Sequence, residues 1–257
     1  MGPVRGLLRL STLLIVFCLY AVAILAVAWM PWRYRGARVG AWPAMHFARF
    51  VIRLFNMRYT FNNVEILRQH QGFVFPNHTS ALDIFLLLHL LPVRFVSKIE
   101  VRSYPVVGLL GTAVGAVFVD RQDKQSRERV RQTLGEVERY PPIVIFPEGG
   151  IFSPPNRLHP FRYGAFEIAV EKGIPFLPCV MTYEPLDIVF WGDEPLVRMI
   201  WRFACYRGPI HAHLQPLHVV HPHPGDDARQ LALETHGAME AVLTYSSRAD
   251  DILQTGI

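Results

Sequence analysis

The sequence predicts an α/β protein in which helices flank a mixed central sheet, preceded by an N-terminal membrane helix and a basic amphipathic helix. Three observations lead to this fold class. Residues 11–30 carry no charge and are mostly apolar, and residues 42–60 combine an apolar stripe with arginines. From about residue 59 onward, short apolar runs alternate with helical patterns, as in a sheet covered by helices. A chain of 257 residues can form one such domain with an appendage.

The apolar run at residues 11–30 is long enough to cross a membrane. Twenty residues at about 1.5 Å each make a helix of about 30 Å, the thickness of the hydrocarbon core. Aromatic side chains, which favour the membrane interface, stand at its far end: Trp29, Trp32 and Tyr34. A cleaved signal peptide is the alternative, because residues 26–28 resemble a cleavage site, but the run is long for one. We assign residues 1–40 to a membrane anchor.

The next segment has the pattern of a basic amphipathic helix. Apolar side chains recur at helical spacing in residues 42–60, and His46, Arg49 and Arg53 form a second stripe. Such a helix can lie among lipid headgroups, or it can pack its apolar face on the domain as an ordinary helix. We assign residues 41–60 to an interfacial helix and residues 61–257 to the main domain.

Composition limits the partners and the compartment. The formal net charge of +5 and the pI near 9.3 suit an anionic partner, such as a membrane surface, a phosphorylated substrate or nucleic acid. Nucleic acid is disfavoured, because the cations are scattered among apolar segments and no recognition module is visible. Three cysteines give no disulfide framework, which is typical of a reducing compartment. The arginines flanking the apolar run favour the cytoplasm for the bulk of the chain.

The main domain alternates predicted strands with predicted helices. The strands are expected at 73–75, 93–96, 116–119, 143–146, 176–181 and 211–220. The helices are expected at 80–91, 125–140, 163–172 and 227–245. Because sites in such folds gather in the loops at strand ends, polar residues there are the candidates for chemistry.

The first candidate is the pair His78 and Asp83, in the segment NHTSALD between a strand and a helix. An imidazole oriented by a carboxylate can take a proton from an alcohol near neutral pH. Ser80 and Asp83 also fit a helix cap, with Asp83 in the first helical turn. One aspartate can do both, so catalysis and capping remain open at this point.

Three further strand ends carry polar residues. Glu148 and Gly149 follow the strand at 143–146, where a carboxylate could hold a hydroxyl and glycine lets the backbone approach a ligand. A plain turn is the alternative for this loop. Arg121 leaves another strand and is suited to grip phosphate, although a lone arginine is more often a surface charge. Lys98, at a fourth strand end, offers a second cation.

Other chemistries lack their motifs. The sequence has no G-x-S-x-G elbow, no P-loop and no G-x-G-x-x-G, and neither Cys179 nor Cys205 has a histidine at a telling spacing. Five histidines occur between residues 211 and 223, but no cysteine or carboxylate pattern completes a metal site. We therefore expect neither a metal nor a cofactor.

Together these segments resemble the glycerolipid acyltransferases typified by 1-acylglycerol-3-phosphate acyltransferase. His78–Asp83 matches the family's NH-x4-D block, and Gly115–Arg121 is similar to its second block. Phe146–Gly149 matches the FPEG block, and Ile174–Pro178 is similar to the apolar-proline block. The resemblance runs from about residue 59 to residue 181.

The resemblance implies transfer of a fatty acyl group from acyl-CoA or acyl carrier protein to the hydroxyl of a lysophospholipid at the membrane. Residues 61–257 would be the catalytic domain, with His78 as general base and Asp83 orienting it. The substrate-binding residues would be Lys98, Arg121, Glu148 and Gly149. The implied location is the cell inner membrane, with the catalytic domain facing the cytoplasm.

One departure bears on the acceptor. In the family the FPEG block commonly continues with a hydroxyl residue and an arginine, whereas Gly150-Ile151-Phe152 follows here. Either Arg157 or Arg162 fills that place, or the acceptor differs from lysophosphatidate. The alternatives are therefore another lysophospholipid or a lyso-aminolipid, or a membrane-surface protein without catalytic activity.

Overall fold

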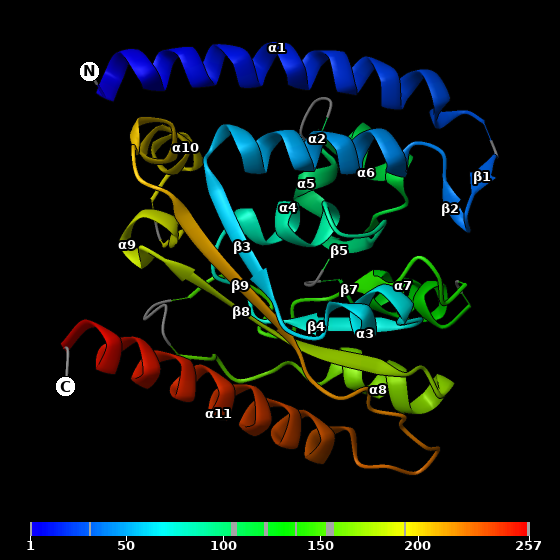
Figure 1. The fold of residues 1–257 in the computed structure, drawn as a ribbon. Coiled ribbons are helices and arrows are strands. Elements are labelled where there is room, and N and C mark those ends of the chain that lie inside the picture. Colours follow the sequence, from blue (N-terminus) through cyan, green and yellow to red (C-terminus); the bar gives the residue numbers. More distant parts are fainter. Residues whose placement is uncertain are drawn as a thin grey trace.

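A seven-stranded mixed sheet organises the chain, which we describe from a computed structural model (Figure 1). The structure describes residues 2–30, 32–103, 107–120, 123–136, 138–152, 157–192 and 194–255. In sheet order the strands are β3 (Met57–Phe61), β9 (Ile210–Pro216), β8 (Phe176–Glu184), β4 (Phe73–Pro76), β7 (Ile143–Val144), β5 (Arg94–Lys98) and β6 (Val117–Val119). Strands β8, β4, β7, β5 and β6 run parallel, and β9 is antiparallel to β8. The predicted fold class is confirmed.

Helices cover both faces of this sheet. They are α1 (Gly2–Ala28), α2 (Ala41–Leu54), α3 (Val64–Gln69), α4 (Leu82–Leu88), α5 (Ile99–Arg102), α6 (Val107–Val114), α7 (Lys124–Glu136), α8 (Gly164–Lys172), α9 (Leu186–Val189), α10 (Leu196–Cys205) and α11 (Ala228–Thr255). The alternating side chains of β4 separate two cores. Val74 joins the core under α2, α4 and α10, whereas Phe73 and Phe75 join the core under α7, α8 and α11. Parallel strands buried on both faces explain the almost continuous apolar runs of the sequence.

The predicted interfacial helix at residues 41–60 is wrong in its extent. Helix α2 ends at Leu54, and residues 57–61 form the edge strand β3, paired in parallel with β9. The chain turns at Asn56, whose φ of +53° is incompatible with a continuing helix. Tyr59, Thr60 and Phe61 then favour a strand. The apolar face of α2 packs on the domain, as the ordinary-helix alternative expected, and Phe47 contacts both α1 and α4.

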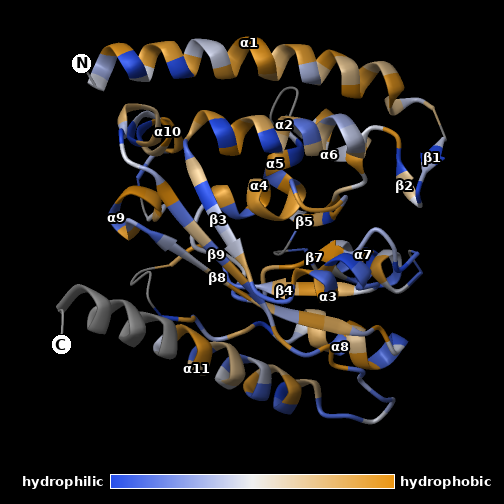
Figure 2. Cartoon of the chain, in the orientation of Figure 1, coloured by the Kyte–Doolittle hydropathy of each residue, from blue (hydrophilic) through white to orange (hydrophobic). Residues whose placement is uncertain are grey.

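Helix α1 lies along the domain instead of leaving it (Figure 1). It is long and apolar enough to cross a membrane, and one side packs on α2, α6 and α10. Near its start, Gly6 allows contact with Trp201 and Cys205, and Arg9 donates to the Ala204 and Tyr206 carbonyls at 3.3 and 2.6 Å. Arg9 thereby satisfies carbonyls at the end of α10 that have no helical partner. The other side of α1 exposes a row of large apolar side chains, seen as orange along the helix in Figure 2.

A short hairpin joins α1 to α2. Its strands are β1 (Arg33–Tyr34) and β2 (Ala37–Arg38), and the turn uses positive φ at Arg35 and Gly36. The absence of a side chain at Gly36 lets the hairpin touch the ring of Tyr140, which would come within 2.8 Å of a Cβ at that position. The hairpin is therefore fixed against the start of the sheet.

Candidate functional site

The loops that carry the candidate residues meet at one edge of the sheet. Because β4, β7, β5 and β8 are parallel, their carboxyl ends point the same way. His78 follows β4 and Glu148 follows β7, the neighbouring strand. Lys98 ends β5, and Tyr183 lies near the end of β8 on the other side of β4. His78, Glu148 and Tyr183 thus come from three neighbouring strands, and Lys98 ends a fourth strand on the same side.

His78 and Asp83 form a hydrogen-bonded pair. The His78 Nδ1 atom lies 2.7 Å from the Asp83 Oδ2 atom. A carboxylate can only accept, so Nδ1 carries the proton and the lone pair of Nε2 is left available as a base. The side chain of Asp83 is completely buried and that of His78 is 18% exposed. The predicted contact between the two residues is confirmed; their role in catalysis stays a prediction.

Asp83 also organises the turn that precedes α4. The same Oδ2 atom accepts from the backbone N–H groups of Thr79 at 2.8 Å and Ser80 at 3.0 Å. One oxygen of Asp83 therefore contacts both His78 and the backbone, but the N-cap of α4 is Ala81, without a side-chain hydrogen bond, and not Ser80 as expected. A carboxylate held by several N–H groups is fixed in position and can orient the imidazole.

Sequence reasoning missed Tyr183, the remaining partner of Asp83. Its hydroxyl donates to Asp83 Oδ1 at 2.6 Å, and the residue is only 4% exposed. Burial raises the pKa of the Tyr183 phenol well above its ordinary value, and the neighbouring carboxylate raises it further. The hydroxyl is therefore always a donor. The two residues are separated by 100 positions, and no local pattern pairs a tyrosine of β8 with this turn.

Aromatic packing fixes the plane of the His78 ring. The Phe146 ring, at the start of the Glu148 loop, stacks on the imidazole with centroids 3.8 Å apart and planes 14° from parallel. Asn77 fixes the backbone on the other side by bonding both the N–H and the carbonyl of Met181 in β8, at 2.6 and 2.9 Å. The imidazole is thus held by its Nδ1 bond, its ring face and its backbone.

Glu148 ties three segments together. Its Oε1 accepts from the His78 N–H at 2.8 Å, and its Oε2 accepts from the His159 N–H at 3.0 Å. The residue is 5% exposed. Burial raises the pKa of its carboxyl, and the backbone hydrogen bonds from His159 and His78 oppose that rise. Both oxygens are thus engaged in positioning loops, and contact of Glu148 with a substrate hydroxyl stays a prediction.

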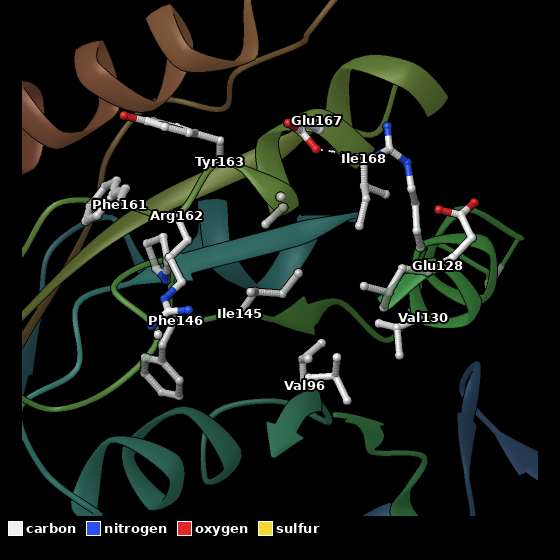
Figure 3. Close-up of a pocket in the computed structure, with 17 residues that line it drawn as sticks. Val96, Glu128, Val130, Ile145, Phe146, Phe161, Arg162, Tyr163, Glu167 and Ile168 are labelled. Atoms are coloured by element: carbon white, nitrogen blue, oxygen red, sulfur yellow. Dashed lines mark hydrogen bonds and ion pairs between the residues drawn. The ribbon is translucent and has the colours of Figure 1, made fainter. Parts of the chain in front are cut away.

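Gly149 creates room for an arginine. Its φ is +81°, and a Cβ there would lie 2.4 Å from Nε of Arg162. The Arg162 backbone N–H donates to the Pro147 carbonyl at 2.9 Å, so the two loops are joined. Figure 3 shows the Arg162 guanidinium beside Phe146, the ring that stacks on His78. Of the two arginines considered for the missing position in the FPEG block, Arg162 is the one beside Gly149.

A cavity of about 740 Å³ extends from this loop between the sheet and helices α7 and α8. Most of its lining is apolar, and Arg162 stands at the Phe146 end (Figure 3). Its apolar members include Val96, Ile145, Val130, Phe161 and Ile168. A mostly apolar cavity next to a potential base suits a ligand with both a hydrocarbon and a polar part.

Of the two predicted substrate-binding cations, Lys98 is described by the structure and Arg121 is not. Lys98 is exposed at the end of β5, which is separated from β4 by β7, so the strand ends are about 10 Å apart. Arg121 lies outside the described residues. Contact of either residue with substrate stays a prediction. Within the described ranges, no group of three or more histidine, cysteine or acidic side chains is arranged to hold a metal ion.

Comparisons with known proteins find similarity to acyltransferases. A family model described as "Acyltransferase" matches residues 58–182. The chain is 30% identical over 174 residues to a lyso-ornithine lipid O-acyltransferase of Pseudomonas aeruginosa, covering 65% of this chain and 66% of the relative. It is 29% identical over 187 residues to a 1-acyl-sn-glycerol-3-phosphate acyltransferase of Limnanthes alba, covering 67% and 65%. The chain thus spans slightly less than two thirds of these relatives.

A solved structure extends the similarity to the whole fold. The 1-acyl-sn-glycerophosphate acyltransferase PlsC of Thermotoga maritima superposes with a TM-score of 0.70, covering 96% of this chain and 98% of that one. The two sequences are 20% identical, so this likeness concerns the fold alone.

Proposed function

Since the chain belongs to the glycerolipid acyltransferase family, we propose that it is a membrane-associated enzyme that acylates a lysolipid hydroxyl. The acyl donor is acyl-CoA or acyl carrier protein, and the first candidate acceptor is 1-acylglycerol-3-phosphate, acylated at its sn-2 hydroxyl to give phosphatidate. The observation that carries the proposal is the His78–Asp83 pair, with a bond of 2.7 Å and a fully buried carboxylate.

In this mechanism His78 is the general base. Its Nε2 atom takes the proton of the acceptor hydroxyl as the oxygen attacks the thioester carbonyl. The tetrahedral intermediate then collapses, the carbon–sulfur bond breaks, and the thiolate leaves and takes the proton from the imidazolium. Asp83 stabilises that imidazolium through Nδ1. A positioned base contributes roughly 10²- to 10⁴-fold in rate.

The second candidate acceptor is a lyso-aminolipid such as lyso-ornithine lipid. Two observations favour keeping it: a similar protein is named as a lyso-ornithine lipid acyltransferase, and the FPEG block lacks its usual arginine. Arg162 beside Gly149 offers a guanidinium for either a phosphate or a carboxylate headgroup. Lys98 and Arg121 are the further cations that we assign to the acceptor, and Glu148 with Gly149 to positioning it.

Helix α1 supplies the membrane attachment in this proposal. Because α1 packs on α2 and α10, its packing favours a helix that lies along one leaflet, with its exposed apolar side in the lipid. It disfavours a helix that crosses the membrane alone. Exposed Leu196 and Val197 of α10 add to the apolar surface beside it. We assign the protein to the cell inner membrane, with the catalytic domain facing the cytoplasm.

A panel of acceptors tests the proposal. Membranes containing the wild-type chain, His78→Ala or the exposed-residue control His211→Ala are given radiolabelled acyl-CoA or acyl carrier protein with lysophosphatidate, other lysophospholipids or lyso-ornithine lipid. We expect acyl transfer by the wild type and by the control, and none by His78→Ala at equal protein level. Transfer that survives in His78→Ala would refute the mechanism. Failure of every donor and acceptor pair with the wild type would favour a non-catalytic membrane protein.

A further inference from the structure

A second cavity lies at the amino ends of the parallel strands, whereas His78 lies at their carboxyl ends. It has a volume of about 370 Å³ and is enclosed by the β1–β2 hairpin, the starts of β5 and β6, and the segment after α7. Arg33 and Arg38 face it from the hairpin, and Arg94 faces it from the first position of β5. The catalytic pair, in contrast, follows the carboxyl end of β4. This cavity therefore belongs to neither the proposed active site nor the apolar cavity of Figure 3.

The described residues do not balance the positive charges of this cavity. Arg33 forms an ion pair with Glu138, the acidic residue that lines the cavity. Arg94 donates through Nε and Nη2 to the Pro141 carbonyl, at 2.9 and 2.5 Å, and through Nη2 to the Glu138 carbonyl, so its partners are uncharged and its Nη1 atom has no such bond among the described residues. Among the described residues, none forms an ion pair with Arg38. Three guanidiniums and one carboxylate leave an excess of two positive charges.

The crowding has an electrostatic cost. The pKa of Arg94 is lowered to about 10, chiefly by burial and then by the charges of Arg33 and Arg38. An oxyanion between the three guanidiniums would offset both effects. The arginine fork matches the oxygen spacing of phosphate, and such charge-assisted hydrogen bonds are among the strongest in proteins.

The cavity also stands next to the membrane-binding part of the chain. The hairpin begins five residues after the last residue of α1, Ala28. Three exposed aromatic residues surround that junction, Trp29 at 77%, Trp32 at 64% and Tyr34 at 55%. Indole and phenol rings favour the headgroup layer, where lipid phosphates lie.

We propose that the cavity bounded by Arg33, Arg38 and Arg94 binds a phosphate group, supplied by the headgroup of an anionic membrane lipid. The site needs no turnover and is independent of which acceptor the enzyme uses. A bound headgroup would fix the hairpin and the end of α1 at the surface of the bilayer.

Ligand-induced stabilisation of the full chain tests this site. The protein in a non-ionic detergent is titrated with dihexanoylphosphatidylglycerol, with zwitterionic dihexanoylphosphatidylcholine, or with inorganic phosphate, and the thermal unfolding midpoint gives an apparent affinity. We expect a rise with the anionic lipid that exceeds the rise with the zwitterionic one. An equal rise with inorganic phosphate at the same concentration would keep the phosphate site and assign it to a soluble source.

Substitutions place the effect at the cavity. Arg38→Gln should weaken the apparent affinity roughly tenfold or more, because a hydrogen bond to a charged group is lost. Arg38→Lys should recover part of the affinity. The matched control is Arg58→Gln, which removes the same charge from exposed strand β3 at the other side of the sheet and should bind as the wild type does. Wild-type affinity in Arg38→Gln, or no stabilisation by any of the three ligands, would overturn the proposal.

Discussion

Removal of the Tyr183 hydroxyl is the most direct probe of how Asp83 is held. In Tyr183→Phe the ring remains and a single hydrogen bond of 2.6 Å disappears. Both residues are buried, Asp83 completely, so water does not replace the donor. A hydrogen bond to a charged group contributes about 1.5–3 kcal/mol. For a chain of this size each kcal/mol corresponds to about 2–4 °C, so the unfolding midpoint should fall by about 3–12 °C.

The same substitution should also slow acyl transfer. Asp83 with one oxygen released orients His78 less well, and we expect kcat to fall roughly tenfold, the equivalent of about 1.4 kcal/mol in the barrier. That loss is smaller than removal of the base itself, which costs about 10²- to 10⁴-fold. KM for the acceptor should stay within about twofold of the wild type, because a buried tyrosine does not touch substrate.

Kinetics and calorimetry on the purified variant separate the two effects. Tyr59→Phe is the control, since its ring is exposed and a lost hydroxyl there should change neither quantity. If Tyr183→Phe lowers the midpoint while kcat is unchanged, the hydroxyl stabilises the fold without positioning the catalytic pair. If KM rises and kcat does not fall, the reasoning about Asp83 is refuted.

Three other expectations concern the loops and α1. Gly149 has a φ of +81° and faces an arginine, so Gly149→Ala should lower the free energy of unfolding by more than about 1 kcal/mol and should lower activity. Gly164→Ala is the control, because nothing lies within 4 Å of a Cβ there, and it should not destabilise the chain. Chemical denaturation compares the two variants. The pKa of Glu148 is raised in the folded protein. Its contribution to the free energy of unfolding is therefore fully present below the pKa of the unfolded state, near 4.5, and is lost as the pH rises through the pKa of the folded state. The stability advantage of the wild type over Glu148→Gln should therefore be larger near pH 4.5 than near pH 7, and a constant difference would contradict the burial argument. Gly6→Cys should form an oxidative crosslink with Cys205 in membranes, detected by mobility in non-reducing gels; its absence would mean that α1 leaves α10 in the bilayer.

Local patterns were enough to predict the parts of the molecule that depend on nearby residues. The contact between His78 and Asp83 is one of these, since a strand end and a first helical turn determine it. The apolar runs of the parallel strands likewise predicted a sheet buried on both faces. Residues 57–61 were missed because β3 is an edge strand with three exposed side chains, so its pairing with β9, not its own pattern, makes it a strand.

Partners from distant segments could not be predicted. Tyr183 reaches the site only through the order of the strands, which the sequence does not state. For Glu148 the sequence indicated a contact with a substrate hydroxyl, which stays a prediction, but not the hydrogen bonds of its carboxylate to the backbone of two loops. The sequence offered Arg157 and Arg162 for the missing arginine of the FPEG block, and only the structure shows that Arg162 lies against Gly149.

The stacking of α1 on α2, and of α2 on α4, sets the distance between the His78–Asp83 pair and the apolar helix α1. Helices pack at about 8–10 Å between axes, so α4, which carries Asp83, lies roughly 16–20 Å from the axis of α1. Under the proposed function, a lipid in the leaflet beside α1 would have to rise by a comparable distance before its hydroxyl meets His78. Each CH₂ withdrawn from the bilayer costs about 0.8 kcal/mol unless protein covers it. Lifting a one-chain lipid costs about half as much as lifting a two-chain lipid, so under the proposed function this geometry would by itself discriminate between acceptor and product.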